Sequence, residues 1–135
     1  MARKIFVNLP VKDLQASVAF FSGLGFTFNP QFTDDTATCM IISDDAYAML
    51  LVESRFQGFT NKKISDATTS TEVMMALSAD SRDDVDTFAD KALATGGTAA
   101  MPPIDLGFMY GRSFYDPDGH HWEIFHMDPA AVTPA

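Results

Sequence analysis

The sequence has 135 residues, the size of one domain or of two small halves that share a core. Hydrophobic residues make up 47% of it, enough to build a core, and 18 acidic residues against 9 basic ones give a formal net charge of −9. Such a surface repels phosphate groups, so it disfavours nucleic acids and anionic membranes as partners. The single cysteine, Cys39, excludes an intrachain disulfide and a cysteine-rich zinc site.

No apolar stretch is long enough to span a membrane, and the apolar run near the N-terminus is too short and too interrupted for a signal peptide. We therefore expect a cytoplasmic protein. The sequence also contains no glycine-rich phosphate loop and no serine–histidine–aspartate order typical of a hydrolase.

The first half of the chain predicts the order β-α-β-β-β. Residues 5–11 alternate in polarity as a strand does. A helix follows, because Asp13 is a favourable N-cap and apolar residues recur at i, i+4, i+7 and i+10 until Gly25, which is typical of a helix end. Three further strands are predicted, at residues 26–32, 36–43 and 47–53.

Residues 55–70 show no clear period and predict a linker, with a helical turn or a lid-like loop as open alternatives. The first pattern then repeats. A capping box beginning at Ser81 starts a helix that ends at Gly96, and residues 107–111 form a loop. The predicted strands of this half are residues 72–79, 98–101, 112–116 and 122–127.

The two halves predict an α+β fold, in which a single domain of residues 1–135 contains βαβββ modules at about 3–54 and 71–128. Each helix covers one face of its sheet, so we expect the other faces to form a curved mixed sheet with a central groove. Strand alternation assigns eleven residues to this groove: Phe6, Asn8, Tyr47, Met49, Leu51, Met74, Ala76, Ser78, His121, Glu123 and Phe125. The loop at 107–111 is aromatic and bracketed by glycines, which favours a flap or, equally, a packed surface loop; it adds Tyr110 and Arg112 to the groove.

Glu123 is the candidate catalytic residue, because it is a carboxylate on an otherwise apolar strand face. One hypothesis makes it a general base that removes a proton next to a carbonyl group. The alternative makes it a groove carboxylate paired with Arg112, His121 or a tyrosine hydroxyl. His121 shares its face and is either a partner for a metal or a proton, or, as we favour, an exposed residue at the turn exit.

Three motifs resemble the vicinal oxygen chelate superfamily, which contains glyoxalase I, bleomycin-resistance proteins and extradiol dioxygenases. They are Val11-Lys12-Asp13-Leu14, Leu24-Gly25-Phe26 and Asp116-Pro117-Asp118-Gly119-His120-His121-Trp122-Glu123. The start, Lys4-Ile5-Phe6-Val7-Asn8-Leu9-Pro10-Val11, is similar to that of small bacterial proteins known as predicted lactoylglutathione lyases. The resemblance covers the whole chain and implies the fold more firmly than the reaction.

The resemblance also implies a divalent metal in the groove, held by residues that match Phe6, Met49, Met74 and Glu123 here. Only Glu123 is an ordinary ligand for zinc, nickel, manganese or iron, because a phenyl ring has no donor atom and a thioether is a soft ligand suited to Cu(I). We therefore predict that the four-ligand metal site is lost and that no cofactor is needed. The residues leave open a weak divalent metal at Glu123 with His121.

These observations predict a glyoxalase-like protein of unknown substrate that binds a small molecule, and the resemblance implies a homodimer. Three specific functions stay open. The chain is a metal-dependent lactoylglutathione lyase, a metal-independent enzyme that uses Glu123 as a base on a small carbonyl compound, or a protein that binds or sequesters a small molecule without chemistry. If it is an enzyme, the expected class is a glyoxalase-type lyase or isomerase.

Overall fold

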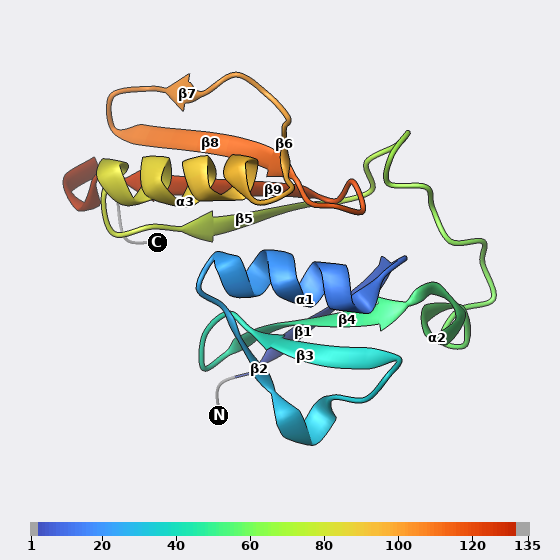
Figure 1. The fold of residues 1–135 in the computed structure, drawn as a ribbon. Coiled ribbons are helices and arrows are strands. Elements are labelled where there is room, and N and C mark those ends of the chain that lie inside the picture. Colours follow the sequence, from blue (N-terminus) through green and yellow to red (C-terminus); the bar gives the residue numbers. More distant parts are fainter. Residues whose placement is uncertain (1–2, 132–135) are drawn as a thin grey trace. The chain divides into compact units, whose positions relative to one another are not determined.

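The computed structural model describes residues 3–131 and divides into two compact units, of which the first ends at Asp66 and the second begins at Ala67. Each unit contains one sheet and one long helix (Figure 1). The first unit has the order β-α-β-β-β and the second has the same order with one additional strand, which confirms the predicted α+β class and its βαβββ modules. The boundary between the units falls inside the segment interpreted as a linker.

The first unit has one four-stranded sheet in the order β1-β4-β3-β2, with β1 parallel to β4 and the other pairs antiparallel. Its elements are β1 (Ile5–Val11), α1 (Leu14–Gly23), β2 (Thr27–Asn29), β3 (Ala37–Ile41) and β4 (Ala46–Val52). The predicted strand at 26–32 is too long. It stops at Asn29 because Pro30 has no amide hydrogen to continue the ladder and Pro30–Phe32 form a 3-10 turn.

The predicted ends of α1 are confirmed. The Asp13 carboxylate accepts a hydrogen bond from the Ala16 amide at 3.1 Å, as an N-cap does. At the other end Gly25 has a φ of +100°, and the Phe26 amide donates to the Phe21 carbonyl at 3.1 Å. This is the hydrogen-bond pattern of a Schellman motif, in which a residue without Cβ takes the left-handed conformation.

A short helix, α2 (Glu53–Gln57), follows β4, so the helical-turn alternative for the linker applies to its beginning. From residue 58 to residue 73 the chain forms turns and bends without a further helix or strand. The helices in residues 3–131 are not long and apolar enough to cross a lipid bilayer.

The second unit contains β5 (Met74–Ser78), α3 (Arg82–Ala94), β6 (Thr98–Ala99), β7 (Ile104–Asp105), β8 (Met109–Tyr115) and β9 (His121–Met127). The sheet has the order β5-β9-β8-β6, and β7 also pairs with β8. Helix α3 begins at the predicted N-cap Ser81, whose hydroxyl accepts from the Asp84 amide at 3.0 Å. Its apolar stripe, including Val85 and Ala89, packs on Ile124 of β9.

Strand β8 begins at Met109, three residues before the predicted start at 112, and the sequence did not predict β7 at all. Most of the predicted loop at 107–111 is therefore strand. The extension is stabilised from both sides, because Met109 pairs with Met127 of β9 and Gly111 pairs with Ile104 of β7. Pairing with a distant segment is a non-local interaction that local composition does not reveal.

Candidate functional site

The sheet of the second unit has one face toward α3 and one face away from it, and Glu123 lies on the second. Along β9, Trp122 and Ile124 are buried on the α3 side, so His121, Glu123 and Phe125 point the other way. The register pairs Glu123 with Ser113 of β8 and Ala76 of β5. The predicted grouping of His121, Glu123 and Phe125 on one strand face is therefore present.

A hollow of about 210 Å³ surrounds Glu123 on this face. It is lined by Met74, Met101, Pro102, Ile104, Gly111, Arg112, Ser113, His121 and Glu123. The aliphatic and methionine side chains make its wall mostly apolar, while Glu123 and His121 contribute titratable groups. Within residues 3–131 the Glu123 carboxylate has no hydrogen bond or ion pair to another protein group.

The side chain of Tyr110 lies on the α3 side, which corrects its assignment to the groove face, whereas Arg112 lines the hollow but directs its guanidinium toward α3. The Arg112 guanidinium bonds Asp86 at 3.1 Å and Asp90 at 2.8 Å, both on α3. The Tyr110 hydroxyl donates to Asp86 at 2.6 Å. Because Ser113 is the residue that pairs with Glu123, its neighbour Arg112 must face the opposite way, so the suggested Arg112–Glu123 pair is also wrong.

These contacts set the electrostatics of the α3 side. The hydrogen bond from Tyr110, followed by that from Arg112, lowers the pKa of Asp86 below its ordinary value. The same hydrogen bond to Asp86, with some burial, raises the pKa of Tyr110. Arg82 adds a second link, because it pairs with Asp105 of β7 and its guanidinium lies 4.5 Å from the centre of the Tyr110 ring.

His121 is 8% exposed, so the prediction that it is a solvent-exposed residue at the turn exit is wrong. It pairs with Met74 of β5 and Tyr115 of β8, and its ring meets the Tyr115 ring edge-to-face with centroids 5.5 Å apart. The functional alternative for His121 therefore gains support, since the imidazole lines the same hollow as Glu123.

Met74 and Ser78 of β5 belong to the same sheet face, opposite His121 and Phe125 in the register. Met74 lines the hollow and is 61% exposed, whereas Ser78 and Phe125 lie outside its wall.

Five predicted groove residues belong to the first unit: Phe6, Asn8, Tyr47, Met49 and Leu51. They occupy neighbouring positions on β1 and β4, where Phe6 pairs with Tyr47 and Asn8 with Met49. The Phe6 and Tyr47 rings are stacked with centroids 4.8 Å apart, and the Asn8 amide donates to the Phe6 carbonyl. These contacts are those of an aromatic sheet face with few polar groups.

The four residues that match the superfamily's metal-ligand positions do not have the chemistry to hold a divalent metal. Phe6 has no donor atom, Met49 and Met74 offer thioethers, and only Glu123 offers an oxygen ligand. Within the part of the chain that the structure describes, no three histidine, cysteine or carboxylate side chains gather as a possible metal site.

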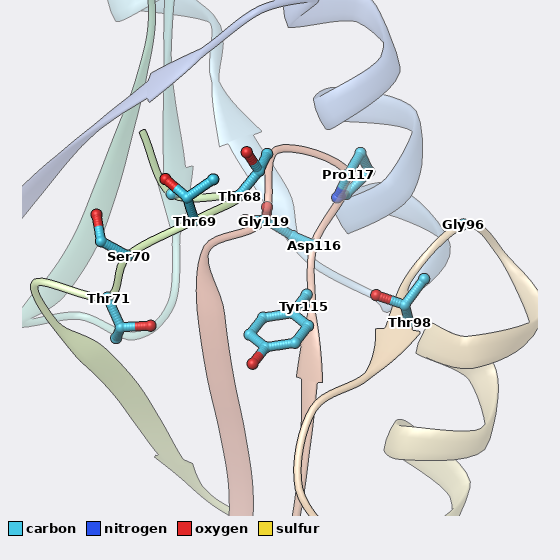
Figure 2. A pocket seen from close by; sticks show the side chains of 11 residues that line it. Thr68, Thr69, Ser70, Thr71, Gly96, Thr98, Tyr115, Asp116, Pro117 and Gly119 are labelled. Atoms are coloured by element: carbon cyan, nitrogen blue, oxygen red, sulfur yellow. The ribbon is translucent and has the colours of Figure 1, made fainter. Parts of the chain in front are cut away.

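A larger hollow, of about 440 Å³, lies beside Tyr115, where β8 ends (Figure 2). Figure 2 shows the Tyr115 ring within it, between Thr71 and Thr98. Hydroxyl groups and backbone dominate its wall, which is formed by Ala67, Thr68, Thr69, Ser70, Thr71, Gly96, Thr98, Tyr115, Asp116, Pro117 and Gly119. The sequence interpretation did not find this hollow, because Thr68, Thr69 and Ser70 belong to the segment taken as a linker.

The carboxyl group of the larger hollow, Asp116, holds the turn before β9 together. It is 6% exposed and accepts from the amides of Asp118 at 2.9 Å and His120 at 3.0 Å, and from Trp122 Nε1 at 2.9 Å. Burial raises its pKa, an effect that the nearby His120 and these donors oppose. A carboxylate with its oxygens already occupied is a structural group, so the Glu123 hollow is the better candidate for chemistry.

Comparisons with known proteins show which family model and which solved structures the chain is similar to. A family model described as the Glyoxalase/Bleomycin resistance protein/Dioxygenase superfamily matches residues 5–124. The hypothetical protein SA1046 from S. aureus has a solved structure with a TM-score of 0.78 and 30% identity, covering 93% of this chain and 95% of that one. The search of curated proteins gave no match.

Two further solved structures are similar in fold. A glyoxalase-related enzyme from Fulvimarina pelagi has a TM-score of 0.78 at 20% identity, covering 93% of this chain and 88% of that one. The fosfomycin resistance protein FosX from Listeria monocytogenes has a TM-score of 0.67 at 18% identity, covering 93% of both chains. At these identities the likeness concerns the fold and not the reaction.

Proposed function

We propose that this chain, which belongs to the Glyoxalase/Bleomycin resistance protein/Dioxygenase superfamily, binds a small organic molecule in the hollow around Glu123. One observation carries the proposal: a carboxylate lies in a mostly apolar hollow without a protein partner among residues 3–131. Removing a charged group from water is unfavourable unless something pairs with it. A ligand that brings a hydrogen-bond donor or a positive charge supplies that partner.

The charges around the hollow favour a ligand with a cationic group and an apolar body. Both arginines of the second unit are already paired with carboxylates, Arg82 with Asp105 and Arg112 with Asp86 and Asp90. Among residues 3–131 neither arginine forms an ion pair with Glu123, and the chain has a formal net charge of −9. The methionines of the wall have flexible side chains that adapt to the shape of an apolar group.

Three probes of nearly the same shape test this charge preference: benzamidine, which is cationic, benzamide, which is neutral, and benzoate, which is anionic. We expect benzamidine to cause saturable amide shifts at Gly111, Ser113 and Glu123 in two-dimensional NMR spectra. Glu123→Gln removes the charge with little change in shape, and we expect it to weaken benzamidine at least about tenfold, which is about 1.4 kcal/mol.

Glu72→Gln is the matched control, because it removes the same charge from an exposed position outside the hollow. It should leave benzamidine binding unchanged. Equal affinity of the wild type and Glu123→Gln, or saturable shifts confined to the hollow at Tyr115, would overturn the proposal.

The second candidate function is metal-independent proton transfer, which the burial of His121 beside Glu123 favours. In this reaction the Glu123 carboxylate takes a proton from the carbon next to a carbonyl group, and the electron pair of the broken C–H bond moves to give an enolate. Returning a solvent deuteron to that carbon exchanges the hydrogen without net change. Deuterium incorporation into hydroxyacetone in heavy water, lost in Glu123→Gln, supports this function; exchange at the same rate in the variant contradicts it.

A further inference from the structure

Gly111 is a glycine at a position where the backbone does not require one. It lies inside β8 and pairs with Ile104 on one side and Phe125 on the other. Among residues 3–131, positive φ angles occur at four other glycines, so the backbone at Gly111 has a conformation that any residue adopts. Glycine inside a strand is unfavourable, because it loses more conformational freedom on folding and offers no side chain to pack.

The space that a side chain would take at Gly111 is already used by Glu123. A Cβ atom added to Gly111 would lie 3.3 Å from Glu123 Oε1, closer than it would lie to Phe125 Cβ at 3.5 Å or to the Ile124 carbonyl at 3.6 Å. Contacts as short as 3.3 Å are tighter than ordinary van der Waals contacts to a Cβ. The carboxylate is therefore the first group that a methyl at this position would displace.

The register shows that Glu123 leans along the sheet to reach this space. Its direct partner on β8 is Ser113, whereas Gly111 is the partner of Phe125 two residues further along. Such diagonal neighbours are within reach of long side chains. The carboxylate reaches this position without crowding because residue 111 carries no side chain, and a Cβ there would require it to shift. Both residues line the hollow, so the lean directs the carboxylate oxygen into it.

We propose that Gly111 is a positioning residue, which leaves room for the Glu123 carboxylate and thereby fixes the direction in which it meets the ligand. The expected effect on ligand binding rests on the proposed function. The geometric part of the inference, that Gly111 sets the direction of the carboxylate, stands independently. Gly111→Ala should therefore leave the fold intact, turn the carboxylate away from residue 111 and weaken a ligand that binds to it.

Three variants separate this role from a structural one. Gly111→Ala adds one methyl group under the carboxylate. Gly58→Ala is the matched control, since its added Cβ also has its nearest neighbour at 3.3 Å, the carbonyl of Arg55, and it lies in the first unit. Gly111→Ala combined with Glu123→Asp shortens the acidic side chain by one methylene and restores room for the carboxylate.

The first readout needs no ligand. In the wild type we expect nuclear Overhauser effects from the Glu123 Hγ atoms to the Hα atoms of Gly111, and in Gly111→Ala we expect contacts to Ser113 to replace them. An unchanged contact pattern in Gly111→Ala would overturn the inference, whatever the ligand. This outcome is distinct from failure of the proposed function, which would appear as a wild type that does not bind benzamidine.

The second readout is a double-mutant cycle on benzamidine affinity. We expect Gly111→Ala to weaken benzamidine at least about fivefold in the wild type and to have no effect in Glu123→Gln, because a positioning residue acts through the charge that it positions. The double variant Gly111→Ala/Glu123→Asp should recover part of the lost benzamidine affinity, and Gly58→Ala should bind benzamidine as the wild type does. An equal loss in both backgrounds would mean that the added methyl group only narrows the hollow, and it would overturn the inference.

Discussion

The turn before β9 gives the sharpest stability prediction, because one carboxylate serves three donors there. Asp116 Oδ1 accepts from the amides of Asp118 and His120 at 2.9 and 3.0 Å, and Oδ2 accepts from the Trp122 indole at 2.9 Å. In Asp116→Asn one oxygen still serves the two amides. The new NH₂ group then faces the indole N–H, so two donors oppose each other in a buried site.

The expected cost follows from this geometry. Losing a hydrogen bond to a charged group costs about 1.5–3 kcal/mol. Burial raises the pKa of Asp116, which means that the ionised carboxylate is itself penalised in the folded state, and the neutral amide relieves part of that penalty. We expect Asp116→Asn to cost about 1–2 kcal/mol and Asp116→Ala, which removes the acceptor that the three donors share, about 3–5 kcal/mol.

Urea unfolding followed by far-UV circular dichroism measures these costs, and the fluorescence of Trp122, the only tryptophan of the chain, reports on the second unit in variants that keep it. The decisive comparison repeats Asp116→Asn in a Trp122→Phe background. Without the indole N–H the opposed donors are gone, so we expect the cost of Asp116→Asn to fall by about 1 kcal/mol or more. An Asn variant as stable as the wild type, or one that costs the same in both backgrounds, would refute the reasoning.

Three further predictions concern the second unit. Gly119→Ala should cost about 2–4 kcal/mol in urea unfolding, because φ is +89° there and the new Cβ would lie 2.9 Å from the Ala67 carbonyl; a cost below about 1 kcal/mol would contradict this. Arg112→Ala should cost about 1–2 kcal/mol in urea unfolding, since it removes a mostly buried side chain from two ion pairs, and a variant as stable as the wild type would contradict this. The lowered pKa of Asp86 means that its ionised form stabilises the fold above the ordinary pKa of about 3.9, and that this stabilisation is lost as the pH falls through the lower folded value. Asp86→Asn should therefore reduce the drop in melting temperature below roughly pH 4. The same drop in the wild type and the variant would show that Tyr110 does not stabilise the ionised form.

Local signals in the sequence predicted the helix ends and the faces of the isolated strands correctly. Asp13 and Ser81 cap the two helices, and Gly25 ends the first, because capping depends on one side chain and the amides within three residues of it. The alternation along β9 placed Glu123 and Trp122 on opposite faces for the same reason, since neighbouring side chains of a strand must point in opposite directions.

The errors arose where the fold depends on pairing between distant segments. The start of β8 is set by its partners β7 and β9, and neither partner is visible from the composition of residues 107–112. The face of Arg112 follows from the register with β9, where Ser113 and not Arg112 meets Glu123. A one-residue error in register reverses a face, so the sequence alone did not show that the Tyr110 hydroxyl and the Arg112 guanidinium point toward α3.

The candidate site lies where two residues contradict the preferences of their surroundings. Glycine is a poor choice inside a paired strand, and a carboxylate without a protein partner among residues 3–131 is a poor choice on an apolar sheet face. Each exception taken alone has a structural explanation, a local bulge for Gly111 or a chance surface charge for Glu123. Their proximity links the two exceptions, because a Cβ at residue 111 would lie 3.3 Å from Glu123 Oε1 and require the carboxylate to shift. Natural sequences tolerate such local conflicts mainly where function requires them, which is why we assign the ligand to this hollow and not to the larger one beside Tyr115.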